Sequence, residues 1–106
     1  MPTDTELLEK LLESTQSGRI DWEKTAVVDQ YSASFGGKWT VLIDRSTKDR
    51  NFYWLTLRNA NGDELLEVNS IQDTRVPEIF LAAKRRALKV DEALADVIKD
   101  LDKPIK

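Results

Sequence analysis

The sequence contains no cysteine and no histidine. Their absence excludes disulfide bonds, thiolate nucleophiles, the usual zinc sites and acid–base catalysis by histidine. The chain also lacks any apolar run close to the about 18 residues of a membrane helix. Its first residues are polar and acidic, without the basic and apolar segments of a secretory signal. We therefore expect a cytoplasmic protein without membrane association.

The 106 residues include 16 basic and 19 acidic side chains, for a net charge of -3, and 41% are hydrophobic. This composition is typical of a globular protein and too apolar for a disordered one. A chain of this length has room for one core, so we expect a single α+β domain over residues 1–106. The acidic excess disfavours a general polyanion binder, because such proteins usually carry a basic excess.

A helix is predicted for residues 4–17. Thr3 and Glu6 have the spacing of a capping box, and Gly18 is placed to end the helix in a left-handed conformation. Leucines follow at helical spacing and predict one stripe that must be buried. They are Leu7, Leu8, Leu11 and Leu12.

The middle of the chain predicts four strands, approximately 28–35, 38–44, 51–59 and 63–70. In the first pair the apolar residues occupy odd positions. A three-residue loop at 35–37, with Gly37 left-handed, would keep them on one face. In the second pair, Asn61-Gly62 is a preferred two-residue turn. It sets Leu57 opposite Leu66 and Leu55 opposite Val68.

The C-terminal third is predicted to be helical over residues 77–102, with Pro77 as a suitable first residue. Because Asp91 could cap a second helix, a kink or break near residues 89–91 is the alternative to one continuous helix. The apolar stripe of this region consists of Phe80, Ala83, Ala87, Val90, Leu94, Val97 and Leu101. The expected order is α-β-β-β-β-α, a four-stranded antiparallel meander with the N- and C-terminal helices packed on one face.

No residue pattern indicates catalysis. The serines lack a histidine partner and a Ser-x-x-Lys spacing, and no glycine-rich phosphate motif is present. The basic cluster Lys84-Arg85-Arg86 with Lys89 could meet phosphates, but acidic residues on the following turns cancel its field beyond about 8 Å. We therefore interpret the cluster as a solvated helix face, and we expect no catalytic residue, cofactor or metal.

The outer face of the predicted sheet, turned away from the helices, is unusually apolar. Contiguous apolar patches mark interaction sites, and Trp and Arg are enriched in binding hot spots. We predict an interaction surface there, with Phe52 and Trp54 as anchors. Its residues are Leu42, Phe52, Trp54, Arg58, Leu65 and Glu67. Three alternatives remain for what covers this face: the segment 18–28 with Ile20 and Trp22, a second copy of the chain, or another protein.

These observations favour a non-catalytic protein-interaction module, such as a small adaptor, inhibitor or regulator, able to form a homodimer through the outer face. One alternative is single-stranded nucleic-acid binding, with bases stacked on the aromatic residues and Arg58 beside them, which the acidic balance disfavours. The other is a small-molecule domain with a pocket lined by Trp22 and Trp39, the former otherwise interpreted as a cap on one end of the core.

Two segments carry a resemblance. Gly18-Arg19-Ile20-Asp21-Trp22 follows the leucine helix, and Arg85-Arg86-Ala87-Leu88-Lys89-Val90-Asp91 lies near the end. This combination resembles small uncharacterised bacterial proteins of about this length. The resemblance implies one bacterial-type α+β domain and carries over no activity and no residue with an assigned role.

Overall fold

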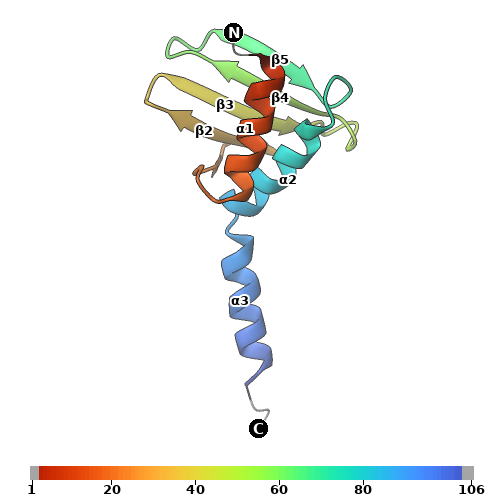
Figure 1. Ribbon diagram of the computed structural model, residues 1–106. Coiled ribbons are helices and arrows are strands. Elements are labelled where there is room, and N and C mark those ends of the chain that lie inside the picture. The colour runs from red at the N-terminus through yellow and green to blue at the C-terminus, as the bar shows by residue number, and fades with distance from the viewer. Residues whose placement is uncertain (1–2, 104–106) are drawn as a thin grey trace.

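A computed structural model describes residues 3–103 (Figure 1). The elements are α1 (Asp4–Gln16), β1 (Glu23–Lys24), β2 (Gln30–Phe35), β3 (Trp39–Arg45), β4 (Tyr53–Arg58), β5 (Glu64–Asn69), α2 (Arg75–Ala87) and α3 (Val90–Leu101). Helices α1 and α2 lie on one face of the sheet, and α3 extends away from the rest of the molecule (Figure 1). The predicted α+β class is confirmed.

The sheet is an antiparallel meander of five strands in the order β1-β2-β3-β4-β5, and the predicted number of four was wrong. The additional strand is β1 at the sheet edge, where Glu23 pairs with Ser32 and Lys24 pairs with Tyr31. Two exposed polar residues show no alternation of polar and apolar side chains, so no local pattern indicated this strand.

The loop between β2 and β3 has the predicted length of three residues but lies one residue later. Phe35 pairs with Trp39, so the loop comprises residues 36–38. Gly36 and Gly37 both have positive φ angles, 62° and 69°, which glycine adopts without a Cβ clash. Moving the loop by one residue shifts the strand pairing by two positions. Odd-numbered residues therefore still pair with odd-numbered residues, and the predicted inner face is retained.

The hairpin of β4 and β5 contains the predicted residue pairs, but its turn differs from the predicted one. The pairs are Leu57 with Leu66 and Leu55 with Val68. The backbone N–H of Asn59 donates to the Asp63 carbonyl, so the loop has three residues, 60–62, in place of two. A register shift after Leu57 accommodates the additional loop residue.

The core lies between the inner face of the sheet and helices α1 and α2. Its largest fully buried side chains are Leu8, Val41, Ile43, Leu55, Val76, Ile79 and Phe80. The Phe80 ring lies 5.5 Å from the ring of Tyr31 and 5.2 Å from that of Tyr53, between ring centroids. The Arg45 guanidinium lies 5.3 Å from the Phe80 centroid and closes this end of the core.

The segment after α1 contributes to the core and leaves the outer face of the sheet uncovered. Ile20 and Trp22 are buried in the core cluster. The Trp22 Nε1–H donates to the Thr15 hydroxyl oxygen at 3.0 Å, and that hydroxyl donates to the Leu11 carbonyl at 2.6 Å. The alternative in which Ile20 and Trp22 fold across the outer face is therefore wrong.

The C-terminal third forms two helices separated by Leu88 and Lys89. Helix α2 begins at Arg75, two residues before the predicted start, and buries Val76, Ile79, Phe80 and Ala83. Helix α3 buries no residue. The prediction that the whole C-terminal region packs on the sheet was wrong for α3, because the helix extends past the sheet and has no surface beneath it (Figure 1).

Candidate interaction surfaces

The six residues predicted as an interaction surface lie on β3, β4, β5 and the residue before β4. The rings of Phe52 and Trp54 are in contact, with centroids 5.9 Å apart. Both are half-buried, and Leu42 is only 8% exposed. The remaining three, Arg58, Leu65 and Glu67, are exposed. Neighbouring side chains therefore already cover part of the apolar area that was expected to be free.

The outer face also holds a buried polar centre that no pattern in the sequence indicated. Asp44 lies opposite Trp54 in the β3–β4 ladder and is buried, as is Thr56. The Gln30 Nε2–H donates to the Asp44 carboxylate at 2.9 Å. Burial raises the pKa of Asp44, while the hydrogen bond from Gln30 and the Arg58 charge oppose this shift. A carboxylate inside the sheet pattern carries no sequence signal of its own burial.

Helix α3 presents the largest continuous set of exposed apolar side chains. Leu94, Val97, Ile98 and Leu101 follow the i, i+3, i+4, i+7 spacing of one helix face. Their exposed fractions run from 46% at Leu94 to 77% at Leu101. The apolar periodicity of the sequence predicted most of this stripe, with the stripe packed in the core, because periodicity shows which face is apolar and not what covers it.

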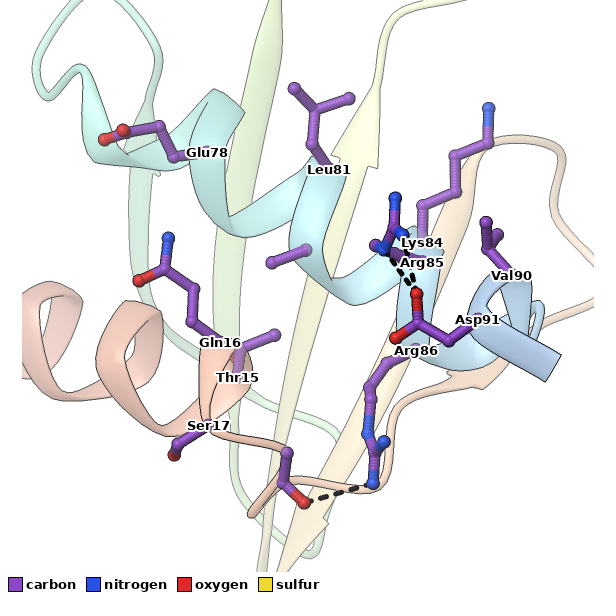
Figure 2. A pocket seen from close by; sticks show the side chains of 12 residues that line it. Thr15, Gln16, Ser17, Glu78, Leu81, Lys84, Arg85, Arg86, Val90 and Asp91 are labelled. Atoms are coloured by element: carbon purple, nitrogen blue, oxygen red, sulfur yellow. Dashed lines mark hydrogen bonds and ion pairs between the residues drawn. The ribbon is translucent and has the colours of Figure 1, made fainter. Parts of the chain in front are cut away.

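The base of α3 is held by contacts between charged and polar groups (Figure 2). The Arg85 guanidinium pairs with the Asp91 carboxylate at 2.6 Å. The Arg86 guanidinium donates to the Gly18 carbonyl at 3.1 Å and so connects α2 to the end of α1. Lys89, between the two helices, has a φ of 54°, in the left-handed region. The Arg85–Asp91 pair and the backbone conformation of Lys89 lie between α2 and α3 and set the direction in which α3 leaves α2.

A groove of about 810 Å³, the α1–α2 groove, lies between the C-terminal end of α1, helix α2 and the first turn of α3 (Figure 2). Its apolar lining includes Leu81, Ala82 and Val90, its basic lining is Lys84, Arg85 and Arg86, and its acidic lining is Glu78 and Asp91. Leu81 is 57% exposed. Because Val90 also belongs to the apolar side of α3, the groove continues that side into the domain.

A second groove, of about 440 Å³, lies between α1 and the β2–β3 end of the sheet. Its lining is mostly apolar and includes Trp39, with Lys10, Ser14 and Arg19 as the polar members. Trp22 does not line this groove and is hydrogen-bonded to Thr15 instead. The structure therefore does not bring Trp22 and Trp39 together as the walls of one pocket.

Within residues 3–103, no group of three or more acidic side chains is arranged to hold a metal ion, and no helix has the length and apolarity to cross a membrane. No family model, curated protein or solved structure matches this chain.

Proposed function

We propose that the chain is a non-catalytic protein-interaction module that self-associates through the apolar side of α3. The observation that carries this proposal is the exposure of α3, a helix of 12 residues in which no residue is buried and every residue after Val90 is exposed. Isolated helices of this length are marginal in water, and most helices in proteins are stabilised by packing of their apolar side. An amphipathic α3 is therefore best explained as a helix that packs against another molecule.

The outer face of the sheet is the weaker candidate for the same function. Leu42 is already buried, and Phe52 packs on Trp54, so a partner there would bury less new apolar area. Apolar burial contributes roughly 25 cal/mol per Å². On α3, four large apolar side chains are available on one side, and an association there gains more free energy per residue contacted.

Single-stranded nucleic-acid binding on the sheet is not favoured by the geometry. The charges of Arg58 and Glu67 both act on Asp44, so groups of opposite sign share this face. A phosphate backbone requires a groove of predominantly positive potential. The mixed charges of the outer face do not provide one.

The experiment that tests the proposal is light scattering of the full chain over a wide concentration range. The wild-type mass should rise from 12.1 kDa toward twice that value, and a Leu94→Gln/Leu101→Gln variant should remain at 12.1 kDa. Both substitutions are at exposed positions and retain good helix formers, so the fold should persist, as circular dichroism would verify.

Two control variants make this experiment specific. Glu92→Gln, a change at another exposed position of α3, should associate like the wild type. Trp54→Ala should also associate normally, because it alters only the outer face. A loss of association in Trp54→Ala, with none in the double variant, would move the interface to the sheet. A wild type that is monomeric at every concentration would refute self-association.

A further inference from the structure

Resting on this proposed function, we infer that two copies pair antiparallel, and that the C-terminal half of each α3 lies in the α1–α2 groove of the other copy. The partner is thus a second copy of this chain, and the contact has two-fold symmetry. Each copy contributes both a helix and a groove.

The charge distribution selects the antiparallel orientation. Residues 84–89 contain four basic and no acidic side chains, whereas residues 90–103 contain five acidic and two basic ones. An antiparallel pair in which the C-terminal half of one α3 reaches the groove brings Asp96 and Asp100 beside residues 84–89 of the other copy. There Arg85 is already paired with Asp91, and Lys84 is the basic groove residue left to meet them. A parallel pair would instead align the acidic segments with one another, which costs free energy at close range.

The apolar spacing of α3 supports a contact between two helices. Val90, Leu94, Val97 and Leu101 are separated by four, three and four residues, which is the a/d spacing of a helix–helix seam. The seam does not end at the base of the helix, because Val90 also lines the α1–α2 groove with Leu81 and Ala82. A partner helix that follows the seam toward this base therefore enters the groove.

The size of the contact requires the groove as well as the helix. A helix of 12 residues is about 18 Å long, and only one side of it can face a partner. Specific interfaces usually involve about 20–30 residues from each protein. Two copies of α3 alone fall short of this number, whereas a reciprocal arrangement adds the groove lining twice.

Lys84 and Asp100 are the residues that best test this arrangement. Lys84 lines the groove and has no ion-pair partner within residues 3–103. Asp100 is exposed in the last turn of α3 and pairs with Lys103 at 3.2 Å, an exposed contact that contributes little to stability. Lysine is favourable to the helix dipole at this end, so Asp100→Lys should not unwind the helix. The two positions lie on the groove and on the helix that we place in it.

The experiment measures dimer dissociation constants for Lys84→Glu, for Asp100→Lys and for an equimolar mixture of the two variants. Each variant alone places like charges together in both symmetric contacts and should dissociate about tenfold more readily. In a mixed dimer, the new glutamate at position 84 would meet the new lysine at position 100 in one contact, and the native Lys84 and Asp100 would meet in the other. The mixture should therefore regain wild-type affinity. Lys48→Glu, in the exposed β3–β4 loop, makes the same charge change as a control and should have no effect.

The outcomes separate this inference from the proposed function. If the wild type dimerises and Lys84→Glu has wild-type affinity, the groove is not the binding site and only the inference is overturned. If both variants weaken the dimer but the mixture does not recover, the two residues do not face one another and the inference is again overturned. A wild type that never dimerises overturns both.

Discussion

Helices α2 and α3 have nearly the same length, 13 and 12 residues, and both are amphipathic, but they have opposite surroundings. Helix α2 buries four residues in the core, and α3 buries none. The difference arises from position, because the sheet lies beneath α2 and ends before α3 (Figure 1). An apolar stripe thus predicts that some surface packs against the helix, and the topology decides whether the same chain supplies that surface.

The difference in burial between α2 and α3 is tested most directly by the stability of two single variants. Phe80→Ala on α2 removes a fully buried ring packed on Tyr31 and Tyr53 and should lower the free energy of unfolding by about 3–5 kcal/mol. Leu94→Ala on α3 should change it by less than about 0.5 kcal/mol in dilute solution. Urea denaturation followed by circular dichroism measures both. Equal losses would show that α3 shares the core.

The connection between the core and α1 offers a smaller test. Trp22→Phe keeps most of the buried ring area but removes the hydrogen bond to the Thr15 hydroxyl, which retains its own bond to the Leu11 carbonyl. We expect a loss of roughly 1–2 kcal/mol in the free energy of unfolding, from the hydrogen bond and from the core volume that the smaller ring leaves empty. Thermal denaturation monitored by circular dichroism suits this variant. An unchanged midpoint would mean that the hydrogen bond contributes nothing net.

The junction between the two helices should respond in the opposite direction. Lys89 ends α2 in a left-handed conformation, and its backbone N–H donates to the Arg86 carbonyl. Glycine adopts this conformation at no steric cost, so Lys89→Gly should raise the free energy of unfolding by up to about 1 kcal/mol. Lys89→Ala is the matched control, since it removes the side chain without relieving the backbone. A variant pair of equal stability would argue against strain at this residue.

The smallest effect concerns the outer face of the sheet and depends on pH. The pKa of Asp44 is raised in the folded protein, chiefly by burial. Below the pKa of the unfolded chain, both states are protonated and the burial has no electrostatic cost. As the pH rises from the unfolded pKa through the folded pKa, the unfolded state loses its proton more readily and the wild type loses stability. Asp44→Asn should therefore gain stability relative to the wild type as the pH rises. Denaturation at a series of pH values measures this difference, and the opposite slope would contradict it.

Local signals in the sequence predicted much of the domain. The Thr3 hydroxyl oxygen accepts a hydrogen bond from the Glu6 backbone N–H at 3.1 Å, as the capping pattern indicated. The alternation of side chains determined the register of both hairpins even though each turn differed by one residue, because a slip by one would have reversed every apolar side chain. Register was therefore more predictable than turn type.

The features that escaped prediction depend on contacts far apart in the chain. Strand β1 exists because Glu23 and Lys24 pair with an edge that β2 already provides. The burial of Asp44 depends on neighbours from two other strands, including Gln30. The exposure of Leu94 and Leu101 depends on where the sheet ends, which no local pattern contains. These are properties of the assembled fold.

The backbone conformation of Lys89, the left-handed residue between α2 and α3, determines where α3 points. All of α3 follows Lys89, so the backbone angles of one residue set the direction of the entire helix. A rotation of about 20° at Lys89 would move the far end of α3, which is about 18 Å long, by roughly 6 Å. The backbone of Lys89, a residue that does not itself line the α1–α2 groove, would therefore control the spacing and tilt of two paired α3 helices.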